Sequence, residues 1–335
     1  MMGEKIRTNR NMGLDSLKAL CAFMVVCIHA PFPGVLGRCF EVICCLAVPC
    51  FFMISGFFYP GCIARKGERN QIIKIVKLTF VSLAAYFVWT FLFFRWTSQD
   101  FSQIIHRLLS VNGMFKLIVC NNVNFAYHLW YLLAFLYVLI IVYSVRKLGM
   151  KKLLFAAVPF LILVSIVIGR YSEVFLGRFI SLDFSRNAYF LGLPFFCIGW
   201  FISENREKIT AKLNKRLLIL LIAVFGMLGP VEYFVLEMLG KGSVGDMYFS
   251  TAFFVVSVFV YCAFFSQGKT IFANIGRKFS TSVYIVHVLV IDVLYDIISK
   301  TSLRDLYAYV APFAIYAVSL MIAWVWDKLR EKKVA

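Results

Sequence analysis

Residues 42–64 read VICCLAVPCFFMISGFFYPGCIA, and none of these 23 residues carries a charged side chain. A helix that crosses the hydrocarbon core of a bilayer needs roughly 20 mostly apolar residues. The stretch does not alternate between polar and apolar residues, as a strand of a membrane barrel would. It therefore predicts a transmembrane helix.

Nine further uncharged runs lie along the 335-residue chain, which is 61% apolar and only 16% charged. Soluble domains have about 45–50% apolar and about 25% charged residues, so the composition excludes a soluble globular enzyme. The sequence predicts an all-α polytopic membrane protein, a bundle of about ten transmembrane helices. The ten predicted spans are 19–37, 42–64, 78–94, 117–145, 153–169, 187–203, 217–231, 247–268, 279–291 and 306–326, with 217–231 and 279–291 extended past Glu232 and Asp292.

The net charge of +18 is explained by topology. Cytoplasmic loops of membrane proteins are rich in Lys and Arg. If the N-terminus lies inside, the inner segments hold 24 of the 35 basic residues, among them Lys5, Arg7 and Arg10, and only six acidic ones. The 24 basic and six acidic residues of the inner segments give a net charge of +18, which equals the net charge of the whole chain. We therefore expect both termini inside and no nucleic-acid partner.

The chain is expected to form one domain over residues 1–335, because it has no repeat, low-complexity tract or linker. Residues 1–13 are basic but lack the cleavage site of a removable signal peptide. Residues 101–109 have apolar side chains at helical spacing, which fits either a helix on the outer membrane surface or an ordinary amphipathic loop helix.

The ten cysteines lie mostly within apolar runs, where they act as small hydrophobic residues. Their spacing does not match a zinc site, and we predict no metal. Cys39 and Cys120 are both expected on the outer side, so a disulfide between them is an alternative to two free thiols.

Ionisable side chains inside a membrane are costly and indicate function by default. The first span holds Asp15, Lys18 and His29. Asp15 and Lys18 are three residues apart and can form an ion pair on one helix face. Lys18 and His29 are eleven residues apart, about three helical turns, so they share a face and lie roughly 16 Å apart. This spacing predicts a passage through the bundle with a cation at its inner mouth and a base near its outer end. Snorkelling of Lys18 to the headgroups and a packing role for His29 are the alternatives.

Two further histidines lie in later spans. His128 begins the outer end of the fourth span within Tyr127–Tyr131, where aromatic residues commonly anchor a helix at the interface. His287 lies about two turns into the ninth span and shares a face with Ser280 and Tyr284. It is expected either to relay protons or bind a polar ligand, or to serve as a structural hydrogen-bonding centre.

Acidic residues near the outer ends of two spans complete the set. Asp292 and Asp296 follow His287 toward the outer side, and Glu232 and Glu237 are expected to cap the seventh span.

Four segments resemble, in order, the signature motifs of the acyltransferase-3 family of integral-membrane proteins. They are Leu14-Asp15 with Lys18 and His29, the segment Val48-Pro49-Cys50-Phe51-Phe52 followed by Ser55-Gly56, the segment His128-Leu129-Trp130-Tyr131-Leu132, and Ser280 with Tyr284 and His287. The family usually has Arg where this chain has Lys18. The second segment is also similar to the membrane domain of the serine racemases of vancomycin resistance, which carry a further soluble domain.

The resemblance implies a membrane O-acyltransferase of the plasma (inner) membrane, which moves an acyl group, most often acetyl, from cytosolic acyl-CoA to a hydroxyl of an envelope polysaccharide or glycolipid. His29 would be the catalytic base and Lys18, held by Asp15, would attract the anionic donor. His287 and Tyr284 would line the path or stabilise the oxyanion, and the substrate-binding residues would be Asp15, Ser55, His128, Trp130 and Tyr284. Acyl-CoA is then a co-substrate, with no bound cofactor. A transporter of a small hydroxylated solute or amino acid, and a partner in glycan export, are the alternatives.

Overall fold

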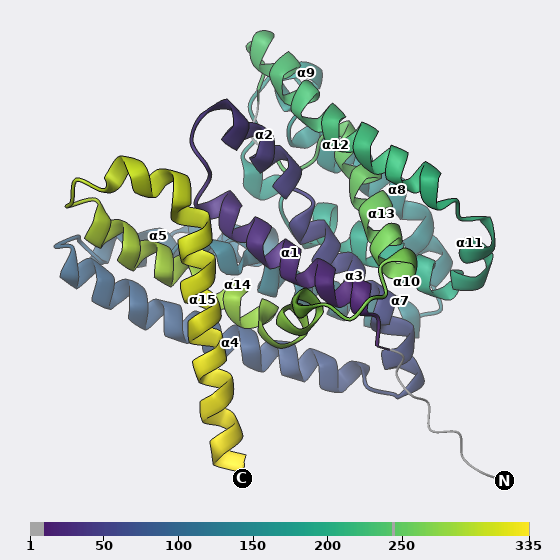
Figure 1. Ribbon diagram of the computed structural model, residues 1–335, viewed down its shortest axis with the longest axis horizontal. Coiled ribbons are helices and arrows are strands. Elements are labelled where there is room, and N and C mark those ends of the chain that lie inside the picture. The colour runs from purple at the N-terminus through teal and green to yellow at the C-terminus, as the bar shows by residue number, and fades with distance from the viewer. Residues whose placement is uncertain (1–9, 243–244, 335) are drawn as a thin grey trace.

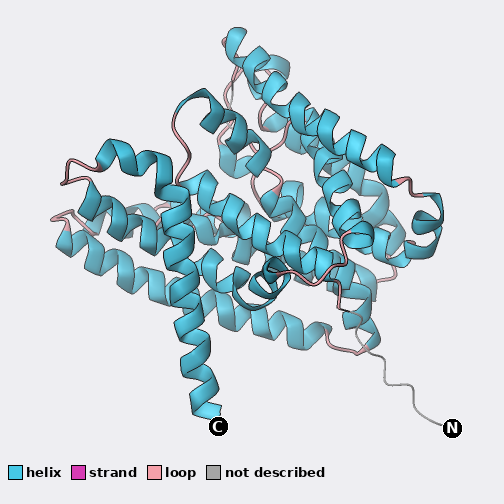
Figure 2. Ribbon diagram, viewed as in Figure 1, coloured by secondary structure: helices cyan, strands magenta, loops and turns pink. Residues whose placement is uncertain are grey.

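The computed structural model describes residues 10–242 and 245–334, with side chains through Glu331. All secondary structure in this part of the chain is helical, as predicted (Figure 2). Lys5 and Arg7, two of the basic residues used to assign the inner side, lie outside the described residues.

Eight helical segments are long and apolar enough to cross a membrane. They are Met12–His29 (α1), Gly34–Ala64 (α2, Gly34–Cys44, with α3, Ala47–Ala64), Glu68–Trp96 (α4), Tyr127–Lys147 (a 3₁₀ turn followed by α7, Trp130–Lys147), Lys151–Ile168 (α8), Lys215–Met238 (α12), Ile271–Ile298 (α14) and Arg304–Glu331 (within α15, Arg304–Val334). Two shorter apolar helices, Ala188–Glu204 (a π-helical turn and α10, Leu193–Glu204) and Phe249–Phe265 (α13), match the remaining two predicted spans.

Short helices join these spans. They are α5 (Ser102–Leu109), α6 (Val111–Cys120), α9 (Ser172–Phe175) and α11 (Arg206–Lys212). In Figure 1, α11 and the end of α15 lie at the right and lower margins, whereas α5 and α9 lie at the left and upper margins. Segments predicted to lie inside and outside therefore occupy opposite sides of the bundle.

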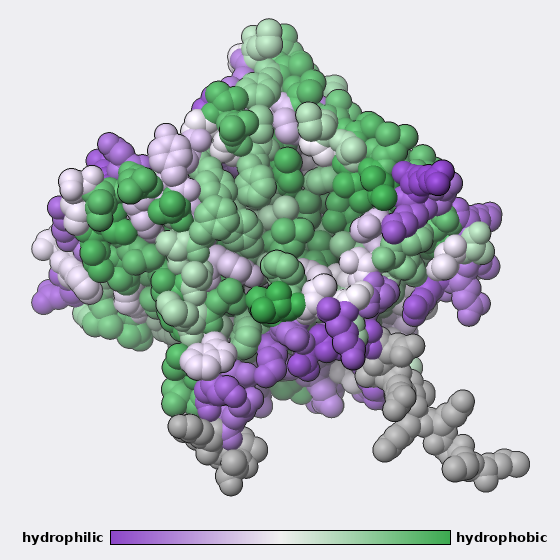
Figure 3. Space-filling model, viewed as in Figure 1, coloured by the Kyte–Doolittle hydropathy of each residue, from purple (hydrophilic) through white to green (hydrophobic). Residues whose placement is uncertain are grey.

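The surface is predominantly apolar between these two sides. Figure 3 shows a broad hydrophobic area across the middle and upper part of this face, with hydrophilic residues gathered at the right and lower margins and a smaller group at the left. Many large apolar side chains are exposed along the long helices, including Phe80, Phe160 and Met227. Such a band is expected of a protein whose solvent is lipid.

Two predicted span boundaries were wrong. The first helix covers Met12–His29 rather than 19–37, because Pro31 and Pro33 follow its end, and Gly34 begins a separate helix, α2. Proline lacks the backbone N–H that a helix interior needs. The run 117–145 is not one helix, because α6 ends at Cys120 and Asn121 adopts a left-handed conformation with φ of 60°. Because no residue of this run is charged, its charge pattern does not reveal that the helix ends before Asn121.

Close packing brings α14 against α1. A Cβ atom added at Gly276 of α14 would lie 1.8 Å from the backbone oxygen of Asp15, so only glycine permits this approach. Small residues commonly allow such contacts between membrane helices. The contact sets the position of α14, and with it His287, relative to the first helix.

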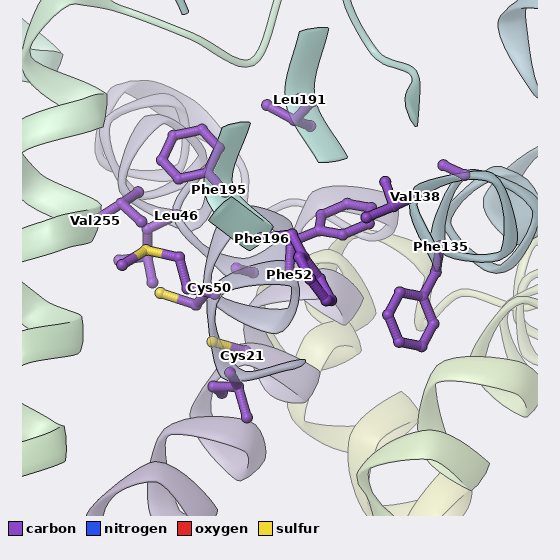
Figure 4. Close-up of a cluster of buried hydrophobic side chains, with 14 of the residues drawn as sticks. Cys21, Leu46, Cys50, Phe52, Phe135, Val138, Leu191, Phe195, Phe196 and Val255 are labelled. Carbon is purple, nitrogen blue, oxygen red and sulfur yellow. The ribbon is translucent and has the colours of Figure 1, made fainter. Parts of the chain in front are cut away.

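The core of the bundle is built around α1, α3, α7 and α10. Figure 4 shows Cys21 of α1 next to Cys50 and Phe52 of α3, with Phe196 of α10 beside them and Phe135 of α7 farther along. Cys21, Cys50 and Phe52 are completely buried. This cluster occupies the middle of the bundle, between the inner and outer ends of α1.

Residues 102–109 do form a helix, α5, as predicted. Phe101, just before it, packs edge-to-face against Phe87 and Phe91 of α4. Its position on a membrane surface stays a prediction. All ten cysteines are free, including Cys39 and Cys120, so the alternative disulfide is not formed.

Candidate functional site

Three of the chain's four histidines meet near the outer end of the bundle. His29 is near the end of α1, His128 is in the 3₁₀ turn before α7, and His287 is in the second half of α14. The ring centroids of His29 and His287 lie 5.1 Å apart, and those of His128 and His287 lie 5.3 Å apart. The predicted base, His29, thus lies in one cluster with His128 and His287. His29 is half-buried, whereas His128 and His287 are buried.

A hydrogen bond determines which nitrogen of His287 carries its proton. Nδ1 lies 2.7 Å from the backbone oxygen of Tyr284. Because a carbonyl oxygen only accepts, Nδ1 must donate, and neutral His287 has its lone pair on Nε2. Nε2 is buried and has no hydrogen-bond partner among the described residues. His287 therefore presents an acceptor nitrogen inside the histidine cluster.

Tyrosines on neighbouring helices hold His128 and α14 in place. The Tyr284 hydroxyl donates to the backbone oxygen of His128, and the Tyr86 hydroxyl donates to the backbone oxygen of Ile285 at 2.5 Å. The ring of Tyr86 packs edge-to-face on His128 with centroids 4.4 Å apart. The single hydroxyl proton of Tyr284 is thus used in the fold and is not available to an oxyanion. The half-exposed aromatic at this end is Tyr127, and His128 points into the protein instead of anchoring the helix.

A small cavity adjoins the histidine cluster, and a larger cavity lies next to it. The smaller, about 20 Å³, is large enough for one water molecule and is lined by His29, His128, Trp130, Tyr131 and Tyr284, together with other residues. The larger, about 240 Å³, lies beyond it. Ile28, Cys45, Arg186 and Asp246 line both cavities, so the two are adjacent.

The larger cavity contains charged residues that were not predicted from the sequence. It is lined by Arg38 and Glu41 of α2, Arg170 and Arg186 of the 169–187 segment, and Asp246, which precedes α13. Arg186 binds Asp246 through two hydrogen bonds of 2.6 and 2.5 Å, and the Arg170 guanidinium lies 4.7 Å from the ring centroid of Tyr248. A sequence signal was present, because these arginines flank spans on the outer side, where basic residues are disfavoured.

The predicted ion pair at the inner end of α1 is confirmed. Lys18 Nζ lies 3.1 Å from Asp15 Oδ1, and Arg10 Nε lies 2.9 Å from Asp15 Oδ2. Lys18 also lies 5.6 Å from the ring centroid of Phe58. Between Lys18 and His29, however, Cys21 and Val25 are 0% and 3% exposed. Packed side chains therefore close the predicted passage in this conformation.

The remaining predicted residues have local partners. The Ser55 hydroxyl donates to the backbone oxygen of Phe51 at 2.9 Å, and Ser280 donates to that of Gly276 at 2.6 Å. Asp292 accepts from the Trp89 indole at 2.9 Å, and Asp296 pairs with Lys300 at 2.8 Å. Of the predicted substrate-binding residues, His128, Trp130 and Tyr284 line the smaller cavity, whereas Ser55 and Asp15 contact other parts of the bundle.

Glu232 has a different role from the one predicted. It accepts hydrogen bonds from the backbone N–H groups of Phe249 and Ser250, both at 2.9 Å, and so caps the start of α13 and not its own helix. Within residues 10–242 and 245–334, no group of three or more His, Cys, Asp or Glu side chains is arranged to hold a metal ion.

The fold and the buried histidines define a multi-pass membrane protein with a polar site near one face. Residues 11–326 match the family described as an acyltransferase domain, and the chain belongs to this acyltransferase-3 family.

Two curated relatives are racemases of enterococci. The chain is 26% identical to a serine/alanine racemase of Enterococcus gallinarum over 67% of this chain and 33% of the relative. It is also 26% identical to an amino-acid racemase of Enterococcus faecalis, over 65% of this chain and 32% of the relative. The chain thus matches about one third of the length of either relative. No solved structure matches it significantly.

Proposed function

We propose that this protein transfers an acyl group, expected to be acetyl, from cytosolic acyl-CoA to a hydroxyl of an envelope polysaccharide or glycolipid at the outer face of the plasma membrane. The observation that carries the proposal is the position of His29. Its half-buried ring lines the smaller cavity, which lies next to the polar outer cavity, and two further histidines pack beside it.

In the proposed reaction, His29 is the general base. It takes the proton of the acceptor hydroxyl as the hydroxyl oxygen attacks the acyl carbon, a common role of imidazole. The new bond joins the acceptor oxygen to the acyl carbon, and the bond between that carbon and the thioester sulfur breaks. His29 then returns the proton to the departing thiolate, so CoA leaves as a free thiol.

His287 is proposed to orient His29. Its Nε2 can accept an N–H from His29, which leaves the other nitrogen of His29 to act as the base. The same contact would stabilise the imidazolium that forms when His29 is protonated. The Nδ1 hydrogen bond to Tyr284 supports this assignment, because it keeps the lone pair on the nitrogen inside the cluster.

Arg186 is the proposed stabiliser of the developing oxyanion. Its guanidinium lines both cavities, and a preorganised N–H donor near the reacting oxygen lowers the barrier of acyl transfer. Asp246 holds it through two hydrogen bonds. Arg186 takes the role that Tyr284 was expected to share, since the Tyr284 hydroxyl donates to His128.

Lys18 is proposed to attract the anionic donor at the inner end of α1. Since Cys21 and Val25 close the space between Lys18 and His29, the acyl group must reach His29 through an opening of the α1–α3 contact. The donor would supply the binding energy for that opening.

The experiment that tests the proposed acyl transfer is mass spectrometry of envelope glycans and glycolipids from cells with and without the protein. Loss of an acyl ester is expected without it, and an unchanged acylation pattern would contradict the proposal.

A transporter is the second candidate, because the chain is similar to one third of a serine/alanine racemase and intramembrane histidines also serve proton-coupled transport. Uptake of labelled serine into vesicles containing the purified protein separates the two functions. The acyltransferase proposal predicts uptake no greater than in empty vesicles.

A further inference from the structure

The smaller cavity is bordered by polar groups and by apolar side chains. Its volume is about 20 Å³, so it has room for a single water molecule, and a methyl group takes up about the same space. His29 and Arg186 line it. Its lining also contains three apolar side chains and a thiol, which acts as a small hydrophobic group: Val25, Ile28, Val48 and Cys45. The proposed base and the proposed oxyanion stabiliser therefore border the same space as a small apolar surface.

Two valines bring this apolar surface close to the base. Val25 precedes His29 by four residues on α1, which is about one helical turn, so the two side chains are neighbours on one helix face. Val25 is 3% exposed. Val48 lies in the first turn of α3 and is half-buried. Because α1 and α3 pack against each other, both valines reach the cavity.

An acyl group in transfer presents two unlike parts to its site. Its carbonyl oxygen gains negative charge as the hydroxyl attacks, and this charge is stabilised by a preorganised N–H donor. Its hydrocarbon chain is stabilised by burial against apolar side chains. The smaller cavity offers Arg186 for the oxygen and Val25 and Val48 for the chain.

We propose that the smaller cavity holds the acyl group during transfer and restricts it to acetyl, and that Val25 and Val48 set this limit. The inference rests on the proposed function and specifies its donor as acetyl-CoA. The acceptor oxygen bonds to the acyl carbon, the thioester C–S bond breaks, and the proton passes through His29 to the thiolate. The hydrocarbon chain forms and breaks no bond. Its length matters because a space for one methyl group leaves none for further methylene groups.

Longer acyl groups are expected to react more slowly, because the side chains around the cavity must move to make room. One extra methylene group changes specificity by about tenfold or more, so propionyl-CoA should be used about tenfold less well than acetyl-CoA and butyryl-CoA on the order of 100-fold less well. Replacement of valine by alanine removes two carbon atoms, and butyryl has two more than acetyl. Val25→Ala and Val48→Ala should each raise the use of butyryl-CoA relative to acetyl-CoA about tenfold.

The test is a competition between two donors. The purified full chain in detergent is mixed with equal concentrations of isotopically labelled acetyl-CoA and butyryl-CoA. Glycans and glycolipids extracted from the envelope of cells that lack the protein serve as acceptors. Mass spectrometry measures the labelled acetate and butyrate that mild alkali releases from the products. Because both donors compete for the same acceptors, the ratio of the two acids equals the ratio of the two kcat/KM values and does not depend on the amount of folded protein.

Val142→Ala is the matched control for the two alanine variants. Val142 of α7 is completely buried and lines neither cavity, so its replacement makes the same change in the core away from the site. We expect it to lower the melting temperature and to leave the ratio of butyrate to acetate unchanged. Val48→Ile makes the opposite change, because it adds one carbon atom to the lining. It should reduce acetyl transfer per folded molecule about tenfold.

The acyl pocket and the proposed function fail in different ways. Equal use of acetyl-CoA and butyryl-CoA by the unaltered protein would overturn the acyl pocket while supporting acyl transfer. A ratio that neither Val25→Ala nor Val48→Ala changes, or that rises equally in Val142→Ala, would also overturn it and would leave the cavity as a site for water. If the unaltered protein forms no labelled ester from either donor, acyl transfer itself is contradicted, and the acyl pocket with it.

Discussion

The imidazole ring of His29, near the end of the first helix, lies 5.1 Å from that of His287, which belongs to a helix near the other end of the chain. The contact exists because α14 packs along α1, with Gly276 against the backbone of Asp15. The contact joins His29, which lines the smaller cavity, to His287, whose acceptor nitrogen Nε2 is buried.

The α1–α14 contact is expected to require glycine at position 276. In Gly276→Ala, the new Cβ would meet the Asp15 backbone oxygen at 1.8 Å, so the helices must separate. We expect destabilisation on the order of 1–3 kcal/mol and loss of acyl transfer per folded molecule. Thermal unfolding in detergent and a transfer assay measure the two effects. Gly268→Ala is the control, because a Cβ atom added there would have no atom of the described residues within 4 Å. Equal melting temperatures of the two variants would contradict the packing argument.

The hydroxyl of Tyr284 is expected to hold the turn that carries His128. Tyr284→Phe removes the donor to the His128 backbone oxygen, and an unsatisfied buried acceptor costs about 1–3 kcal/mol. We expect a lower melting temperature together with slower transfer. Tyr295→Phe, an exposed tyrosine on the same helix, serves for comparison. An equal loss of stability in Tyr284→Phe and Tyr295→Phe would mean that the hydrogen bond from Tyr284 to His128 does not stabilise the fold.

Lys18 is expected to act on the donor and not on the acceptor. In Lys18→Ala, the KM for acetyl-CoA should rise about tenfold, as expected when one charged contact is lost, while the KM for the acceptor stays the same. Arg at this position keeps the charge and can grip a phosphate with two N–H groups, so Lys18→Arg should remain active. An active Lys18→Ala protein beside an inactive Lys18→Arg protein would exclude the proposed role.

Opening of the bundle on donor binding is expected to expose Cys21. This thiol is 0% exposed and lies in the core between Lys18 and His29. Treatment with N-ethylmaleimide followed by peptide mass spectrometry should find Cys21 unmodified in the resting protein and modified in the presence of acetyl-CoA. Cys39, which is partly exposed, should react in both samples. Protection of Cys21 under both conditions would mean that the donor does not travel along this face of α1.

The helical membrane fold was predictable because hydrophobic length and the distribution of charge report directly on a bilayer. The ends of the spans were less predictable. The run 117–145 has no charged residue, yet Asn121 takes a left-handed conformation and accepts from the backbone N–H of Ala188 at 2.9 Å, which ends the helix. Only a tertiary contact reveals that break.

The candidate site was predictable only in part, again because some of its residues come together only through folding. His29 and His287 stood out because a histidine within an apolar run is conspicuous. Arg186 and Asp246 did not, since each lies in a polar connecting segment and they meet only through folding. His128 was assigned to an aromatic anchor because its neighbours are aromatic, and only the fold shows that its ring is turned inward.

The most direct measurement is transfer of labelled acetyl from acetyl-CoA to an envelope acceptor by the purified protein and by His29→Ala. A general base contributes about 10²–10⁴-fold to a rate, so we predict a loss of that size in His29→Ala with an unchanged melting temperature. His106→Ala, in which the histidine outside the cluster is replaced, should retain full activity. Equal transfer by His29→Ala and the unaltered protein would contradict the assignment of His29 as the base.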